Sequence, residues 1–310
     1  MSKKTKYLFG ILLTIIIGMI LMWYYCCNTG TTDEHQQDLD NQKEVVEEPI
    51  PETTINTGFT IKDPDPDGNF AYTSNDNFNF TQSDFNIQNP VSEKVDNGID
   101  LLKAHLNSNS EKALDITGLY TASETNTSAF PNLGIARANT IKNYLSTKGI
   151  PSQQINIFGE ENNDISLKDS VYMGPVRYAI SKNSSQEVQE LETLKQRIND
   201  DPLILYFRNA QSSINPTVAQ RQKIADISRY LDKVEGATIT IEGHTDNIGG
   251  REINIALGEK RANSIKQDFI NNGIPDSKII ITSKGPDEPI ASNETEEGRA
   301  QNRRSIVKIN

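Results

Sequence analysis

One stretch of this 310-residue chain occurs twice, and this internal repeat constrains the fold more than any other feature. Residues 133–151 (LGIARANTIKNYLSTKGIP) match residues 257–275 (LGEKRANSIKQDFINNGIP) without a gap. The match extends toward the N-terminus, where residues 113–121 (ALDITGLYT) correspond to residues 238–246 (TITIEGHTD). Self-similarity of this kind indicates two copies of one structural unit, so a single fold has to account for both.

Both copies predict the same order of elements. A short strand precedes a helix that begins near an Asn-Pro pair, and a second strand leads into the repeated Leu-Gly-x-x-Arg-Ala-Asn helix. Two further strands follow, so the order predicts βαβ crossovers with a layer of helices packed on one sheet. The strands expected outside the repeated core are residues 77–80, 156–159 and 176–181 in the first copy and residues 203–207, 278–285 and 304–309 in the second.

Side-chain patterns in the second copy support this assignment. Apolar residues recur at helical spacing, which predicts one buried helix face, and the strand that follows alternates between apolar and polar positions. The repeated helix should end at a glycine, with proline soon after it. The residues concerned are Val218, Ile224, Ile227 and Leu231 on the helix, Ile239 and Ile241 on the strand, and Gly149 and Gly273 at the helix ends.

A segment of residues 184–200 joins the two copies, which we place at residues 69–183 and 201–310. Ser184 and Glu187 have the spacing of a capping box, which predicts a connecting helix. An apolar stripe on that helix favours docking on a domain or on a partner chain over a long coiled coil. The stripe consists of Val188, Leu191, Leu194 and Ile198.

Residues 7–25 (YLFGILLTIIIGMILMWYY) contain no charged side chain and predict a transmembrane helix. Lysines precede this segment in residues 1–6, so the positive-inside rule places a short tail in the cytoplasm and the remainder beyond the membrane. A cleaved signal or lipidation at Cys26 or Cys27 is the alternative, but bulky Trp-Tyr-Tyr stands where small residues are needed. An uncleaved anchor favours the inner membrane, with the outer membrane as the alternative.

Residues 26–68 are acidic and contain four prolines, so they predict a disordered, extended linker. The formal net charge of the chain is −11, which argues against a nucleic-acid partner and against broad adhesion to anionic lipid. The adjacent Cys26 and Cys27 do not form a metal framework, and the three histidines are scattered. We therefore expect no metal site and no cofactor.

An acid and a base stand on neighbouring elements of the second copy. Asp246 follows a strand, and Arg261 lies on the helix after it, where Asn254, Leu257 and Arg261 share one face. Such a pair can bind a ligand that carries both charges, because arginine holds a carboxylate through two parallel hydrogen bonds. The alternative is an internal salt bridge between Asp246 and Arg261.

A series of short motifs runs through the second copy in a fixed order. They are Gly243-His244-Thr245-Asp246, Gly249, Asn254, Leu257, Arg261-Ala262, Gly273-Ile274, Gly298-Arg299-Ala300 and Asn302-Arg303-Arg304. In these residues the second copy resembles the OmpA-like periplasmic domain, which binds peptidoglycan in bacterial envelopes. This resemblance implies an α/β two-layer sandwich in each copy and a ligand, the diaminopimelate residue of the peptidoglycan stem peptide. It further implies that Asp246 accepts from the ammonium of that residue and that Arg261 holds its carboxylate.

Further residues are assigned around this pair. Asn254 is expected to add a hydrogen bond or to orient the loop, and Thr245 and Asn247 supply nearby polar groups. Backbone N–H groups of residues 247–250 are expected to complete the pocket. By the resemblance, Arg304 lies at the edge of the site, whereas Arg303 forms a structural ion pair.

Two other groups of residues are expected to have structural roles only. His244 is expected to be a packed histidine at the end of a strand. Glu294, Glu296 and Glu297 are expected to form a solvated loop face.

The first copy departs from the pattern. It keeps the helix arginine as Arg137, but its strand ends in Leu-Tyr-Thr-Ala with no acid, and Glu124 lies in a longer loop. Without that acid a ligand ammonium would stay unpaired, at a cost of roughly 1–3 kcal/mol. The first copy is therefore predicted to fold without binding diaminopimelate, as a spacer or as a contact for another envelope protein.

The sequence thus predicts a membrane-anchored, non-catalytic peptidoglycan-binding protein whose bulk is periplasmic. A stator subunit like the flagellar protein MotB is one alternative, but it needs an ionisable group in its membrane helix, and residues 7–25 have none. An adaptor whose first copy binds another protein is a second alternative. A wall hydrolase would need a metal cluster or a catalytic constellation, which the sequence does not supply. The sequence does not indicate an oligomeric state.

Overall fold

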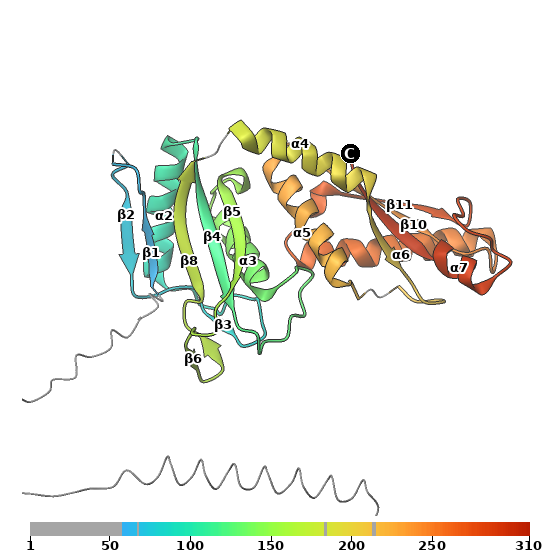
Figure 1. Cartoon of the computed structure of the whole chain (residues 1–310), viewed down its shortest axis with the longest axis horizontal. Helices are drawn as coiled ribbons and strands as arrows, with labels where there is room; N and C mark the ends of the chain where they lie inside the picture. Colours follow the sequence, from blue (N-terminus) through green and yellow to red (C-terminus); the bar gives the residue numbers. More distant parts are fainter. Residues whose placement is uncertain (1–57, 67, 183–184, 213–214) are drawn as a thin grey trace, which may run out of the picture. The chain divides into compact units, whose positions relative to one another are not determined.

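A computed structural model describes residues 58–66, 68–182, 185–212 and 215–310 (Figure 1). The expected cytoplasmic tail, the expected anchor at residues 7–25 and most of the expected linker lie outside these ranges. None of the helices within them is both long and apolar enough to cross a membrane.

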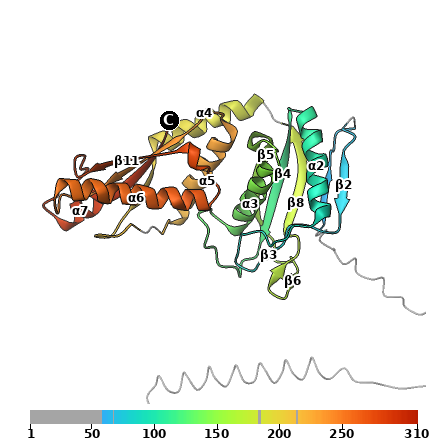
Figure 2. The same ribbon diagram turned by 180° about the vertical axis from the view of Figure 1, so that it is seen from behind.

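The second copy contains a four-stranded sheet in the order β11-β10-β12-β9. Strand β10 pairs parallel with β11 and antiparallel with β12, which in turn pairs antiparallel with β9. Figure 2 shows the two long helices α5 and α6 over one face of this sheet. The bounds are β9 Leu203–Tyr206, α5 Val218–Lys233, β10 Ile239–His244, α6 Arg251–Asn271, β11 Ile279–Gly285 and β12 Arg304–Ile309.

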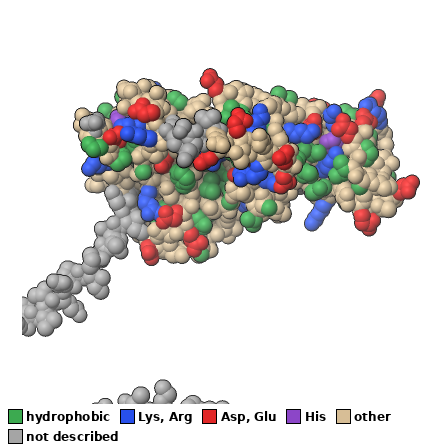
Figure 3. Space-filling view, turned by 45° about the horizontal axis from the view of Figure 1, so that its top comes forward, with side chains coloured by type: hydrophobic (Ala, Val, Ile, Leu, Met, Phe, Trp, Pro, Cys, Tyr) green, Lys and Arg blue, Asp and Glu red, His purple; other side chains and the backbone are tan. Residues whose placement is uncertain are grey.

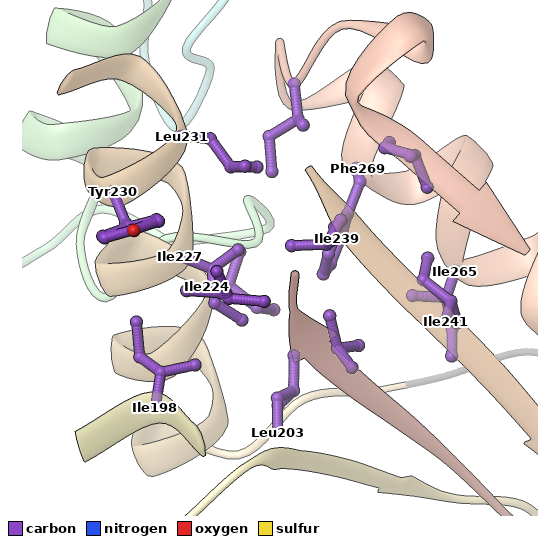
Figure 4. Close-up of a cluster of buried hydrophobic side chains, with 14 of the residues drawn as sticks. Ile198, Leu203, Ile224, Ile227, Tyr230, Leu231, Ile239, Ile241, Ile265 and Phe269 are labelled. Atoms are coloured by element: carbon purple, nitrogen blue, oxygen red, sulfur yellow. The ribbon is translucent and has the colours of Figure 1, made fainter. Parts of the chain in front are cut away.

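The core of the second copy lies between these two layers, and Figure 4 shows its side chains converging from helices and strands. The alternation of β10 is confirmed, because Ile239 and Ile241 are both completely buried. The apolar face of α5 is confirmed for Ile224 and Ile227. It is wrong for Val218, which is 77% exposed because it occupies the first position of the helix, beyond the core.

The first copy repeats part of this topology in a three-stranded sheet with the order β5-β4-β8. Strand β4 pairs parallel with β5 and antiparallel with β8, as β10 does with β11 and β12. The helices α2 and α3 supply the second layer, and their buried side chains share one core with β4, β5 and β8. The bounds are α2 Glu93–Ser108, β4 Lys112–Tyr120, α3 Leu133–Thr147, β5 Ile155–Glu161 and β8 Val176–Lys182.

The start of the first copy differs from the sequence prediction. The strand expected at residues 77–80 is reduced to β3 (Phe80–Thr81), which pairs with β7 (Val171–Tyr172) in a small sheet that also contains β6 (Leu167–Lys168). Strand β1 (Phe59–Lys62) instead forms a hairpin with β2 (Ala71–Ser74).

Residues 59–62 were expected to belong to the linker, and that prediction is wrong for them. Phe59 and Ile61 are 0% and 1% exposed. The ring of Phe59 packs on that of Tyr178, with the two ring centroids 4.8 Å apart. The alternation Phe-Thr-Ile-Lys is a strand pattern. The strand was not predicted because the acidic residues and prolines around it indicate a linker.

The connecting helix α4 spans Ser185–Asp200. Leu194 and Ile198 are each 5% exposed and belong to the core of the second copy, with Leu191 packed against it. The predicted docking stripe is therefore confirmed for these three residues. Ser184 and the side chain of Val188 lie outside the described part of the chain.

Two local predictions can be compared directly with the backbone. Gly149 and Gly273 have φ of +95° and +86°, so the predicted glycine ends of α3 and α6 are confirmed. The expected loop at Glu296 and Glu297 is wrong, because both residues lie in the first turn of a short helix, α7 (Glu296–Asn302). The side chain of Thr295 caps this helix by accepting from Gly298 N–H.

Candidate functional site

A pair of glycines brings helix α6 against strand β10. A Cβ atom added to Gly243 would lie 1.9 Å from the carbonyl oxygen of Gly258, so no other residue fits at Gly243 without moving the helix. Gly118 and Gly134 form the same contact between β4 and α3, at 2.1 Å. The close approach places the arginine one turn further along each helix beneath the carboxyl end of the strand.

Arg261 is completely buried at this position. Its Nη1 donates to the carbonyl of His244 at 3.0 Å and its Nε to that of Gln211 at 3.1 Å, whereas Nη2 reaches Arg208 O only at 3.4 Å. The guanidinium also lies over the ring of Phe207. Burial lowers the pKa of Arg261 to about 10, so it stays charged at neutral pH.

Asp246 does not pair with Arg261, so the internal salt bridge considered as the alternative is not the arrangement found. One carboxylate oxygen of Asp246 accepts from Arg303 Nη1 at 3.0 Å, and the other accepts from the N–H of Ile248 at 3.1 Å. Among the described residues, no aspartate or glutamate side chain accepts a hydrogen bond from Arg261.

Arg303 extends this ion pair to the surface, since its Nη2 donates to Glu296 at 2.8 Å. Burial lowers the pKa of Arg303, but the hydrogen bonds to Asp246 and Glu296 outweigh that effect and raise it overall. The sequence predicted a structural ion pair for Arg303 without naming its partner. The signal was the Asn-Arg-Arg run just before β12, whose first arginine reaches the strand end that carries Asp246.

Asn254 and Thr245 both hold the loop that carries Asp246. Asn254 Nδ2 donates to Ile248 O at 3.1 Å, which is the loop-orienting role, and the residue is 3% exposed. Thr245 Oγ1 donates to the carbonyl of Asp246 at 2.8 Å. Asn247 is exposed beside them. Of the backbone N–H groups expected to face a ligand, that of Ile248 is already taken by Asp246.

Arg304 is not part of this cluster. Its Nη2 donates to Glu288 O at 3.1 Å and its Nη1 to Asn302 O at 3.4 Å, and no hydrogen bond joins it to Asp246 or Arg261. The structure therefore brings together Asp246, Arg261, Asn254 and Thr245, and the expected place of Arg304 at the edge of the site stays a prediction.

His244 is 1% exposed, and neither ring nitrogen has a hydrogen-bond partner within the described part of the chain. Burial, with the charge of Arg304 as the next cause, lowers the pKa of His244 to about 4. The imidazole is therefore neutral at physiological pH, in agreement with the expected packed histidine. In the ranges that the structure covers, no three His, Cys, Asp or Glu side chains gather as a metal site would require.

The first copy holds the counterpart arginine in the same way. Arg137 is completely buried, and it donates to the carbonyls of Leu119 at 2.8 Å and Asp84 at 3.1 Å. These two residues correspond in sequence to His244 and Gln211.

The difference between the copies is a carboxylate. Glu124 Oε1 accepts from Arg137 Nη2 at 2.5 Å, and Oε2 accepts from Nη1 at 3.2 Å. The same carboxylate accepts from the backbone N–H groups of Ser83 and Thr121, each at 2.9 Å. Four donors thus surround the carboxylate of Glu124.

The two backbone donors have counterparts in the second copy. Ala210 corresponds to Ser83, and both residues have a left-handed backbone, with φ of 55° and 60°. Asp246 corresponds to Thr121. Where the chain is described, no protein group accepts from the N–H of Ala210 or of Asp246.

Charged side chains of both signs are interspersed over the face drawn in Figure 3. That face has no extended field of one sign.

Each copy is thus a two-layer α/β domain with a buried arginine beneath the carboxyl end of one strand, β4 in the first copy and β10 in the second. A model of the OmpA family matches residues 79–170 and 206–303, together more than half of the chain. The chain belongs to the OmpA family.

Individual relatives match about a third of the chain. The outer membrane protein Omp38 of Acinetobacter baumannii is 38% identical over 108 residues, which are 34% of this chain and 30% of that protein. The peptidoglycan-associated lipoprotein of Pseudomonas aeruginosa is 33% identical over 103 residues, covering 33% of this chain and 60% of the relative. The match thus spans less than two thirds of either relative.

Solved structures also match about a third of this chain, but the match covers most of each solved chain. The peptidoglycan-associated lipoprotein of Burkholderia pseudomallei is 29% identical, with 34% of this chain and 89% of that chain covered and a TM-score of 0.32. The C-terminal domain of Helicobacter pylori MotB is 26% identical, with 36% and 84% covered and a TM-score of 0.30.

Proposed function

We propose that this chain is a non-catalytic envelope protein that binds peptidoglycan, and that its second copy recognises diaminopimelate of the stem peptide. Membership of the OmpA family and the similarity to peptidoglycan-associated lipoproteins support the wall as the partner. In this proposal residues 7–25 anchor the chain in a membrane, the inner one by preference, and the folded part tethers that membrane to the wall from the periplasm.

The observation that carries the proposal is the unequal partnering of two equivalent arginines. Arg137 and Arg261 are buried in equivalent places and donate to equivalent carbonyls, but among the described residues only Arg137 has a carboxylate partner. The carboxylate of Glu124 therefore indicates where a ligand carboxylate would lie in the second copy. Its donors there would be Arg261 Nη2 and the N–H groups of Ala210 and Asp246.

Asp246 supports the second half of the ligand. Diaminopimelate carries an ammonium and a carboxylate on one distal carbon, so the acceptor for the ammonium has to lie beside the arginine. Each carboxylate oxygen can accept more than one hydrogen bond, so Asp246 keeps capacity for an ammonium while it accepts from Arg303 and Ile248. Arg303 then fixes the direction in which that carboxylate points.

Access to Arg261 requires a local movement. The guanidinium is 0% exposed, and the carbonyls of Arg208 and Gln211 that cover it belong to a segment, residues 208–211, whose residues are all exposed. The bond from Nη2 to Arg208 is the longest of the three, at 3.4 Å, and hydrogen bonds at this distance are weak. A ligand carboxylate would replace that bond, so this segment has to shift on binding.

The proposal is tested by sedimentation with purified sacculi that contain diaminopimelate. The variants are Asp246→Asn, which keeps the shape of the side chain, and Asp276→Asn as a matched control. Asp276 is 69% exposed and pairs with Lys266, far along the chain from the site. We expect the wild type and the control to pellet with the wall and Asp246→Asn to bind at least about 10-fold more weakly. Unchanged pelleting of Asp246→Asn would overturn the proposed site.

A second comparison tests the ligand itself. Lysine at the same position of the stem peptide keeps the distal ammonium but lacks the distal carboxylate. Because buried Arg261 would then be left without that partner, sacculi of the lysine type should bind at least about 10-fold more weakly. Equal binding to both walls would retain peptidoglycan as the partner and contradict recognition of diaminopimelate.

A further inference from the structure

We propose that the first copy contains a carboxylate-binding site of its own, which the chain fills with the side chain of Glu124. This inference goes beyond the proposed function, because it concerns the copy that lacks a counterpart of Asp246. The ligand class is a simple carboxylate with no requirement for a neighbouring ammonium.

The burial and the donors of Glu124 describe a complete anion site. The side chains of Glu124 and Arg137 are both 0% exposed. Two guanidinium N–H groups and two backbone N–H groups converge on one carboxylate. Charge-assisted hydrogen bonds of this kind are strong, and backbone donors at a buried position are costly to leave unpaired.

Glu124 reaches this position from a loop rather than from a helix or strand. The connection from β4 to α3 comprises residues 121–132, whereas that from β10 to α6 comprises residues 245–250. A turn at the start of the longer loop, closed by Glu124 N–H donating to Thr121 O at 3.2 Å, folds the glutamate back over the strand end. The loop is also tied to Ser83, whose Oγ accepts from Thr125 N–H at 3.0 Å.

The groups that surround the carboxylate of Glu124 have counterparts in the second copy. The glycine pair, the arginine, the two carbonyls that orient it and the left-handed residue at Ser83 or Ala210 all recur. A purely structural buried ion pair would not need this shared frame. The shared arrangement indicates an anion-binding site. In the first copy the longer loop fills that site with the carboxylate of Glu124.

An occupant on the same chain has a high effective concentration, so free carboxylates at millimolar levels would not displace it. The first copy as folded therefore does not take wall carboxylates. The first copy can bind an external carboxylate at Arg137 only when residues 121–132 move away and remove Glu124 from the site.

The test replaces the internal carboxylate with one from solution. Thermal unfolding of the chain is followed for the wild type, Glu124→Ala, Glu124→Gln and Glu160→Ala, in sodium acetate and in sodium chloride of equal ionic strength. Glu160→Ala is the matched control, since its ion pair with Arg177 in the same copy is half exposed. Any acetate that binds at Arg261 is common to all variants, so the difference from wild type is the readout.

We expect Glu124→Ala to lower the melting temperature by about 5 °C or more. Acetate at about 100 mM should restore at least half of that loss, relative to chloride. Wild type and Glu160→Ala should show no such difference. The glutamine side chain of Glu124→Gln still fills the site, so this variant should have a lower melting temperature that acetate does not restore.

Two results would overturn the proposal. The first is equal melting of Glu124→Ala in acetate and in chloride. The second is rescue of Glu124→Gln to the same extent as Glu124→Ala. If Glu124→Ala does not fold in chloride, recovery of its circular dichroism signal in acetate is the readout, and failure to recover counts against the proposal.

Discussion

Arg303 Nη1 donates a 3.0 Å hydrogen bond to Asp246, and this contact, not one with Arg261, holds the acid at the end of β10. The two side chains are 8% and 10% exposed. The acid and the buried arginine of the proposed site are therefore held independently, Asp246 by Arg303 and Arg261 by backbone carbonyls. This separation leaves Arg261 without a carboxylate from the described residues.

Replacing Arg303 by alanine should weaken both the fold and the site. Removing one partner leaves a largely buried carboxylate unpaired, so we expect the free energy of unfolding to fall by about 3 kcal/mol. Wall binding should fall as well, because Asp246 loses its orientation. Urea unfolding and sedimentation with sacculi measure the two effects.

Arg251→Ala is the control for this variant, since Arg251 is 67% exposed in its pair with Asp287. An exposed pair contributes at most about 1 kcal/mol, so this change should have little effect. Equal losses for Arg303→Ala and Arg251→Ala would show that the pair with Asp246 has no special role.

Gly243→Ala should displace α6 from β10. The added Cβ meets the carbonyl of Gly258 at 1.9 Å, and the backbone on both sides resists the shift. We expect a loss of about 1–3 kcal/mol in the free energy of unfolding and weaker wall binding, because Arg261 moves with the helix. Chemical denaturation and sedimentation with sacculi give the two quantities.

Gly250→Ala is the matched glycine change. Its φ is −74°, and the nearest atom to an added Cβ is 3.9 Å away, so an alanine fits without strain. Its free energy of unfolding should stay close to that of the wild type. A loss as large as that of Gly243→Ala would argue against the close approach of strand and helix as the cause.

Burial of His244 should make stability depend on pH. Its pKa is about 4 in the folded chain, against an ordinary value of 6.5. Between these values the unfolded chain binds a proton that the folded chain does not, so stability is fully present above pH 6.5 and falls as the pH drops toward 4. The loss from this residue approaches about 3 kcal/mol.

His244→Leu should flatten this part of the pH profile, because leucine carries no titrating group. Denaturant unfolding at several pH values between 4 and 7 measures the slope for both proteins. A variant with the same slope as the wild type would show that other groups cause the pH dependence.

The sequence predicted the repeated part of the fold well, because the spacing of apolar residues and the glycines that end helices agree there. The alternating Ile239 and Ile241, the apolar face of α5 and the glycines after α3 and α6 each indicate one local structure. The repeat itself predicted that β4 and β10 have equivalent neighbours. Two wrong predictions have causes in the local sequence. Strand β1 was assigned to the linker because its alternating pattern is only four residues long, and α7 was assigned to a loop because this short helix begins with charged residues.

For the proposed site, the sequence selected the residues but did not predict their pairings. Residue types and the family pattern selected Asp246 and Arg261, and helical spacing placed Asn254 on the same face as Arg261. The pairing of Asp246 with Arg303 depends on how β10 and β12 meet in space. The partner of Arg137 was also hidden, because Glu124 comes from a loop whose path no periodicity predicts.

A titration of the chain with free diaminopimelate by calorimetry tests the central claim most directly. The comparison ligand is Nα-acetyl-lysine amide, which keeps the distal ammonium but carries no carboxylate. The account predicts one diaminopimelate per chain, and binding at least about 10-fold weaker both for the comparison ligand and for diaminopimelate with Asp246→Asn. Two sites per chain, or equal affinities for the two ligands, would contradict it.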